Sequence, residues 1–311
     1  MDRLLIVFFV LLFFMPSHAQ EKKDSTSASS IAAFVFLDSF VVTAKREGFN
    51  VEEFIELVQQ DESFFKAFQN LRIISYKAQN KQSFYDKRGA TIAQYESLTE
   101  QFYDAPCRTM EIQSESSSGK FYKKNKKYKF YTSKMFDQVF FTHGKVCQVD
   151  SLVSTQKLKG IQKHISELKK LIFQPGQKVD VPIIGGKTAI FTEKMIPYYN
   201  YSIKQEKYRG DIEAYSFVAA VKPEYEEKKE GKTIIKYLKT YFERKTFQVL
   251  GRDYRLQYQG ALFDFDVRME VELKKLGNLY IPEKIRYQGE WDIPTKKPEN
   301  GTFEAYFYDF K

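Results

Sequence analysis

The sequence predicts an α+β fold in which a large, twisted antiparallel sheet is covered on one face by amphipathic helices. Three observations favour this class. The chain has 29 phenylalanines and 21 tyrosines among 311 residues, and aromatic side chains favour strands. Along residues 263–273 apolar and charged side chains alternate, which is typical of a strand with one buried and one wet face. Short linkers at Gly260-Ala261 and Gly277-Asn278 then make successive strands antiparallel neighbours.

Residues 1–19 have the pattern of a cleavable secretory signal. Arg3 supplies the positive charge, an apolar run extends from Leu4 to Met15, and small residues precede the expected cleavage after Ala19. The run is shorter than the about 20 residues that cross a bilayer as a helix, although an uncleaved anchor is the alternative. We therefore expect an exported protein, periplasmic or extracellular, that is soluble after signal cleavage and has no transmembrane segment.

The mature chain is predicted to consist of a leader and one domain. Residues 20–30 are polar and rich in serine, so we expect a flexible leader. Residues 31–311 are predicted to form a single β-rich α+β domain, which one hydrophobic core can support. The 49 basic and 40 acidic residues give a net charge of +9, typical of a solvated surface with some attraction to anionic membranes or envelope polymers. We predict no nucleic-acid partner.

Two helical regions are expected to cover the sheet. Asn50 and Glu53 form a capping box, and apolar residues then continue at helical spacing over residues 51–71, as two short helices or one kinked helix. A second amphipathic pattern covers residues 156–173 and stops at Pro175-Gly176.

Strand-like patterns occupy most of the remaining chain. One short strand is predicted at residues 38–44, and residues 73–131 are strand-like with turns at Gly89, Gly119 and Asn125. The last third contains six strand-like runs, near residues 214–221, 233–243, 246–258, 262–273, 279–288 and 302–310.

Two connections have unusual compositions. Residues 120–129 interleave three aromatic residues with six lysines, a mixture found in nucleic-acid stacking platforms. Because lysines also protect edge strands from aggregation, we favour an edge hairpin here. Ile184 to Lys187 contain two glycines and a lysine but lack the spacing of a phosphate-binding loop, and they predict a hairpin turn.

Cys107 and Cys147 are the only cysteines. In an exported protein this pair favours a disulfide. A metal site is the alternative, but His143 and His164 do not complete a zinc-ligand spacing with the cysteines. We predict neither a metal nor a cofactor.

The sequence contains no recognisable catalytic motif. The Gly-x-Ser-x-Gly, His-Glu-x-x-His, P-loop and Cys-x-x-Cys patterns are all absent. Asp264 and Asp266 share the wet face of one strand and have the chemistry of paired acids or a calcium site. They belong to a run of alternating charges, so we interpret them as solvated sheet surface and predict that the protein is not an enzyme.

Two segments resemble known envelope proteins. Residues 240–258, in which one strand ends in a Thr-Phe turn and the next returns, resemble a β motif of outer-membrane biogenesis. With the N-terminal amphipathic helix and the long meander, the chain resembles secreted envelope proteins of Gram-negative bacteria and the LolA/LppX-like lipid or lipoprotein carriers. This resemblance implies a half-open barrel whose concave apolar face, lidded by helices, accepts lipid or acyl chains. Residues 37–46 resemble the segment before the plug of TonB-dependent receptors, which implies an outer-membrane or TonB-linked partner; a solitary edge strand is the alternative.

Three functions remain open. The first is a periplasmic binding or carrier protein for a lipid, an acyl chain or another apolar envelope ligand, which needs an unfilled apolar cavity. The second is an envelope assembly or structural factor that binds a partner protein through a sheet edge, and the third is a hydrolase without a readable motif. Six apolar residues are candidates for lining a carrier cavity, although each fits a filled core equally well: Phe54, Phe64, Phe68, Phe263, Phe265 and Met269.

Overall fold

The computed structural model describes residue 31 and residues 50–147, 171–180, 184–226, 231–260, 264–292 and 297–311. The signal, the leader, the strand predicted at residues 38–44 and residues 156–170 of the second predicted helix lie outside the described residues.

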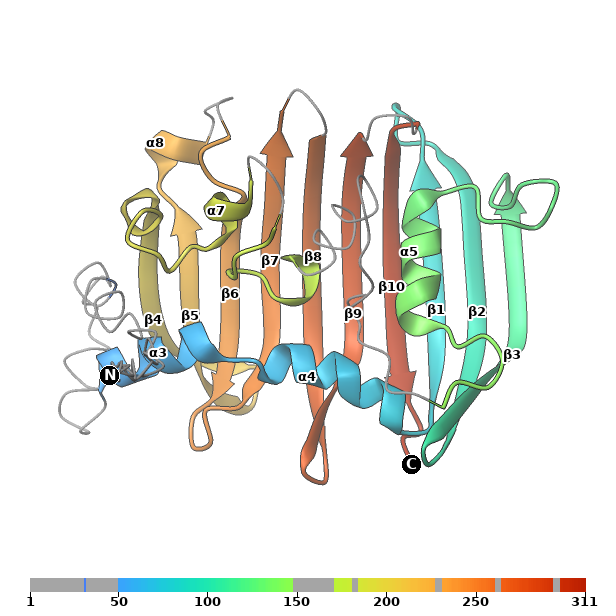
Figure 1. The fold of residues 1–311 in the computed structure, drawn as a ribbon, viewed down its shortest axis with the longest axis horizontal. Helices are drawn as coiled ribbons and strands as arrows, with labels where there is room; N and C mark the ends of the chain where they lie inside the picture. The colour runs from blue at the N-terminus through green and yellow to red at the C-terminus, as the bar shows by residue number, and fades with distance from the viewer. Residues whose placement is uncertain are drawn as a thin grey trace, which may run out of the picture.

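Ten antiparallel strands form one open sheet (Figure 1) in the order β3-β2-β1-β10-β9-β8-β7-β6-β5-β4. Among the described strands the first, β1, pairs with the last, β10, so strands from both halves of the chain belong to the same sheet. This arrangement confirms the predicted α+β class with a large antiparallel sheet that does not close into a barrel. The strands are β1 (Tyr76–Tyr85), β2 (Thr91–Asp104), β3 (Cys107–Gly119), β4 (Tyr199–Tyr208), β5 (Ile212–Val221), β6 (Ile235–Glu243), β7 (Val249–Gln259), β8 (Asp264–Leu276), β9 (Leu279–Asp292) and β10 (Glu299–Tyr308).

The last six strands, β5 to β10, confirm the six strand-like runs of the sequence. In β8, Val267, Met269 and Val271 are buried, whereas the charged residues between them are partly or fully exposed. The turn between β8 and β9 contains Gly277 at φ 58°, a left-handed conformation that glycine adopts without steric cost. Strand β4 was not predicted, because its central and C-terminal residues are mostly polar and charged.

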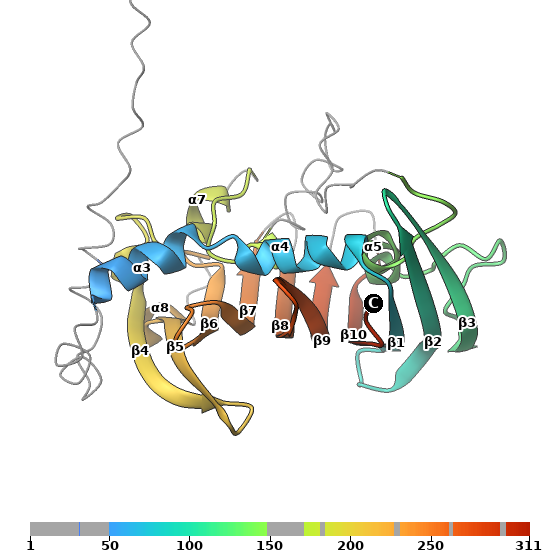
Figure 2. The same cartoon turned by 90° about the horizontal axis from the view of Figure 1, so that it is seen from below.

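The helices cover one face of the sheet, as expected (Figure 2). Helices α3 (Val51–Gln60) and α4 (Ser63–Asn70) cross the strands, followed by the 3₁₀ turn η1 (Leu71–Ile73). Asn50 caps α3 by accepting the amide hydrogen bond of Glu53 at 3.2 Å, as the capping box predicts. Helix α5 (Tyr131–Phe140) runs along the strands near β10 and β1 (Figure 1). Shorter elements are α7 (Gly185–Thr188), α8 (Pro223–Glu226) and η2 (Ile196–Tyr198).

The predicted hairpin turn at Ile184–Lys187 is wrong. Residues Gly185–Thr188 form the single helical turn α7, and the Thr188 hydroxyl donates to the Gly185 carbonyl oxygen at 2.9 Å. A Cβ on Gly185 would lie 2.2 Å from the carbonyl oxygen of Val179. The glycine therefore serves close packing against a neighbouring backbone rather than a hairpin.

The prediction that residues 120–129 form an edge hairpin of the sheet is also wrong. They form a small hairpin with one isolated bridge, between Tyr122 and Tyr128, that belongs to no strand of the sheet. Phe121 is buried and stacks on Tyr95, with ring centroids 4.9 Å apart. This aromatic packing anchors the segment on the end of the sheet, so β3 is the edge strand instead.

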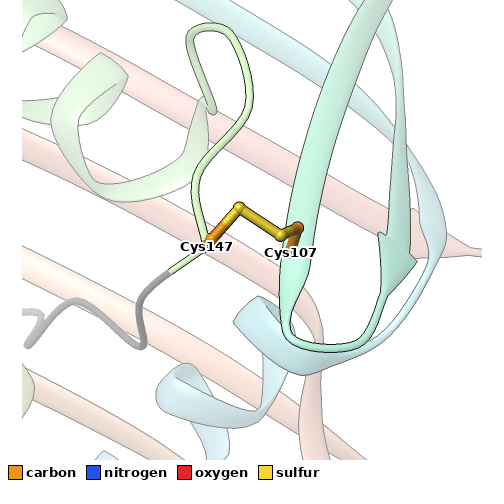
Figure 3. Close-up of a disulfide and its surroundings, with 2 residues drawn as sticks. All are labelled: Cys107 and Cys147. Atoms are coloured by element: carbon orange, nitrogen blue, oxygen red, sulfur yellow. A yellow bond between two sulfur atoms is a disulfide. The ribbon is translucent and has the colours of Figure 1, made fainter.

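Cys107, at the start of β3, and Cys147, in the segment after α5, are joined by a disulfide with the sulfur atoms 2.15 Å apart (Figure 3). Their neighbours Arg108 and Val146 exchange two backbone hydrogen bonds of 2.8 and 2.9 Å. The segment that follows α5 is thus fastened to the edge strand by covalent and hydrogen bonds together.

Candidate functional site: an apolar crevice under helix α5

An apolar crevice of about 50 Å³ lies between α5 and the sheet. One wall consists of α5 side chains, among them Met135, Phe136 and Val139, and the end of the crevice is formed by Ile172 and Phe173. The floor consists of side chains from β8, β9 and β10: Met269, Ile285, Tyr287 and Phe303. Among the described residues that line the crevice, only Thr132 and Tyr287 have a side-chain oxygen atom. The crevice therefore has the chemistry of a hydrocarbon site.

Helix α5 is positioned by a carboxylate from the last strand. Glu299 of β10 accepts hydrogen bonds from the backbone amides of Tyr131 and Thr132, at 2.5 and 3.0 Å. A carboxylate at a helix N-terminus pairs with unsatisfied amides and with the positive end of the helix dipole. The Ser133 hydroxyl donates to Gln82 of β1 at 2.7 Å. The first turn of α5 is thereby fixed on β1 and β10.

The end of the crevice at Ile172 is held by a buried tyrosine. The hydroxyl of Tyr254, in β7, donates to the carbonyl oxygen of Ile172 and lies 3.0 Å from the sulfur of Met269. Burial raises the pKa of Tyr254 and of Tyr287 above the usual tyrosine value. Both phenols are therefore neutral at physiological pH, and the crevice floor carries no charge.

Replacing Tyr254 by phenylalanine is expected to lower the free energy of unfolding by about 1–3 kcal/mol, because the Ile172 carbonyl loses its buried donor. Urea unfolding measures the loss. Tyr280→Phe is the matched control, since the Tyr280 hydroxyl makes no hydrogen bond with another described residue, and it should change stability by less than about 0.5 kcal/mol. Equal stabilities for the two variants would show that the Tyr254 hydroxyl does not hold this end of the crevice.

The five sequence candidates that the structure describes do not line one cavity. Phe54 packs against Tyr215, Phe217 and Phe242 over β5 and β6. Phe64 and Phe265 are buried core residues. Phe68 contacts the crevice-lining Phe140 and Phe173, and Met269 lines the crevice itself. Phe263 lies outside the described residues.

Sequence reasoning missed helix α5, which supplies most of one wall. Met135, Phe136, Val139 and Phe140 follow the helical i, i+1, i+4, i+5 spacing, and this was the signal available. The signal is short, and the preceding lysine-rich stretch was interpreted as β structure.

The described residues considered above as paired acids or metal ligands form ion pairs and hydrogen bonds with neighbouring residues. Asp266 forms an ion pair with Arg255 of the neighbouring strand at 2.6 Å, and Asp264 accepts the Gly260 amide at 2.8 Å. His143 contacts Asp137 at 2.9 Å, while His164 lies outside the described residues. Across the described residues, no three His, Cys, Asp or Glu side chains are grouped closely enough to hold a metal ion. None of the described helices is long and apolar enough to span a membrane.

Comparison with solved structures gives loose structural likenesses. No protein-family model and no curated protein sequence matches the chain. An outer membrane lipoprotein-sorting protein domain from Vibrio parahaemolyticus is similar over 80% of this chain and 92% of its own, with 8% identity and a TM-score of 0.26. A DUF1329 family protein from Desulfovibrio piger is similar over 79% and 92%, with 10% identity and a TM-score of 0.24. Because both superpositions are loose, the function proposed below depends on the crevice itself.

Proposed function

We propose that this protein is a periplasmic carrier that binds a lipid or acyl chain in the crevice between α5 and strands β8 to β10. The observation that supports it is the almost wholly apolar lining of the crevice beside α5, a helix whose first turn is fixed on the sheet. In water, such a surface gains about 0.8 kcal/mol for each ligand methylene that it removes from solvent. A carrier also needs no catalytic group, only shape and apolar area.

The crevice volume defines how binding proceeds. About 50 Å³ is well below the roughly 300–1,000 Å³ of sites that enclose a small molecule. The end of an acyl chain enters first, and a longer chain then displaces the C-terminal half of α5 from Phe303 and Ile285. The Glu299 cap remains in place and holds the first turn of α5 on the sheet during this movement.

The proposal includes the predicted chain organisation. Residues 1–19 direct export and are removed, and residues 31–311 form a single carrier domain in the periplasm. Candidate partners are a lipid or a lipoprotein and an outer-membrane or TonB-linked protein that receives the ligand.

A second candidate function is an assembly factor that binds a partner through β3. Residues 111–119 of this edge strand are exposed on both faces. Within the described residues, β3 pairs on one side only, with β2, apart from the bridge between Arg108 and Val146. An exposed edge of this kind can accept an added strand.

The test is lipid binding by the full chain purified without detergent from the periplasm of a Gram-negative host. We expect mass spectrometry of an organic extract to find a stoichiometric acylated species. A fluorescent long-chain fatty acid should bind the delipidated protein and be displaced by the extracted lipid. Val139→Trp fills the crevice and should lower the affinity for the fatty-acid probe about tenfold, because roughly two methylenes of the probe are no longer buried.

Ile112→Trp is the matched control, because it adds the same indole to the exposed edge strand β3, where Ile112 is 50% exposed. It should leave probe binding unchanged. If Val139→Trp does not fold, Met135→Gln places a polar amide in the crevice lining instead. A lipid-free protein that binds no probe, or equal losses in crevice and control variants, would reject the carrier function and favour the edge-strand candidate.

A further inference from the structure

Residues 120–129, here called the lysine hairpin, project from the end of the sheet between β3 and α5 (Figure 1). The hairpin is closed by backbone hydrogen bonds of 2.9 Å, from Lys123 N to Lys127 O and from Lys126 N to Lys123 O. Asn125 also accepts the Lys127 amide at 3.2 Å. All six lysines are exposed: Lys120, Lys123, Lys124, Lys126, Lys127 and Lys129.

The aromatic residues of the lysine hairpin face the protein. Phe121 stacks on Tyr95, and Phe130, the residue after the hairpin, stacks on Phe84 with ring centroids 3.8 Å apart. Tyr122 and Tyr128 pair with each other across the hairpin at 5.6 Å. This packed base holds the lysines on a defined tip. It also occupies the rings that a nucleic-acid platform would use to stack on bases.

The positive charge of the tip is not neutralised by the protein around it. None of the six ammonium groups forms an ion pair with a carboxylate of the described residues. The nearby carboxylates bond to phenols instead: Glu115 accepts from the Tyr95 hydroxyl at 3.3 Å and Asp137 from the Tyr128 hydroxyl at 2.7 Å. Elsewhere on the surface, lysines such as Lys81 and Lys239 lie within 3.1 and 2.7 Å of glutamates.

An exposed apolar residue lies near the base of the lysine hairpin. Ile92, at the start of β2, is 41% exposed, and its carbonyl lies directly beside Gly119, the residue before the hairpin. Lys87 and Arg88, in the turn before β2, are also exposed at this end of the sheet. Cationic side chains next to an exposed apolar residue are the combination that binds the interface of an anionic bilayer.

We infer that the lysine hairpin, with Ile92, docks this protein on an anionic lipid bilayer. The ammonium groups contact phospholipid phosphates, and Ile92 enters the headgroup region. Each lysine brought close to such a surface strengthens binding about fivefold. Docking does not depend on the crevice, but it places the first turn of α5 next to the membrane.

Vesicle flotation of the full chain tests the inference. We expect binding to vesicles of phosphatidylcholine with phosphatidylglycerol, no binding to phosphatidylcholine alone, and release as salt rises toward about 0.5 M. The triple variant Lys123→Gln, Lys124→Gln, Lys127→Gln should bind the anionic vesicles about a hundredfold more weakly. Its fatty-acid probe binding should stay unchanged, which separates the failure of docking from the failure of the carrier function.

The matched control has the same loss of charge at the opposite end of the sheet. Lys207, Lys245 and Lys275 are exposed in or beside the β4–β5, β6–β7 and β8–β9 turns, and their replacement by glutamine should change vesicle binding less than threefold. If the two triple variants lose equal amounts of vesicle binding, net charge alone explains the effect and the proposal is overturned. The absence of wild-type binding to anionic vesicles, or binding to soluble polyanions only, would also overturn it.

Discussion

Replacing Asp61 by asparagine is expected to lower the free energy of unfolding by about 3 kcal/mol. Asp61 lies between α3 and α4, and its Oδ2 is 2.9 Å from Nη2 of Arg252 in β7. Only 10% of the Asp61 side chain and 7% of the Arg252 side chain are exposed. The guanidinium also lies over the Phe64 ring and donates to Thr240. Without the carboxylate, a buried cation loses its counter-ion in apolar surroundings.

Urea unfolding followed by the fluorescence of Trp291, the single tryptophan, measures this loss. Asp211→Asn is the matched control, because Asp211 is exposed and should change stability by less than about 0.5 kcal/mol. Adding Arg252→Met to Asp61→Asn removes the unpaired cation, so the double variant should be more stable than Asp61→Asn alone. If Asp61→Asn and Asp211→Asn have the same stability, the ion pair does not hold α3 and α4 on the sheet.

The part of the fold that the sequence predicts best is the part whose signal is local. Strand β8 alternates buried and exposed residues along most of its length, and that period alone identifies it. The capping box at Asn50 and Glu53 identifies the start of α3 in the same way. The pairing of β1 with β10 has no local signal, because it joins Lys77 to Tyr308 across most of the chain.

Helix α5 shows why the site was predicted only in part. Phe130, at the N-cap of α5, has no side chain able to cap, and the capping carboxylate comes from Glu299, 168 residues from Tyr131. A helix whose cap is supplied by tertiary structure lacks the usual start signal. Met269 was predicted because its strand is periodic, whereas its crevice partners Phe136 and Phe303 meet only after the sheet has formed.

Removing the disulfide by the double replacement Cys107→Ser, Cys147→Ser is expected to lower the free energy of unfolding by about 4 kcal/mol. The bond joins residues 40 positions apart, and a loop of that length loses about this much chain entropy in the unfolded state when it is closed. The loop contains β3 beyond Cys107, the lysine hairpin and the whole of α5. The disulfide therefore restrains the segment after α5, and its loss should loosen the helix that covers the crevice.

Two measurements distinguish the effect of losing the disulfide from the effect of placing serine side chains at positions 107 and 147. A reductant should lower the stability of the wild-type protein to that of the double variant and should leave the double variant unchanged. Amide hydrogen exchange in Tyr131–Phe140 should become faster in the reduced protein, because the segment after α5 then has no covalent bond to β3. It is held there by the two backbone hydrogen bonds between Arg108 and Val146 and by the hydrogen bond from Arg108 to the Thr142 hydroxyl. A stability loss without faster exchange in α5 would mean that the disulfide stabilises the edge of the sheet alone, and that the Glu299 cap and the apolar contacts with Phe303 are sufficient to hold the helix over the crevice.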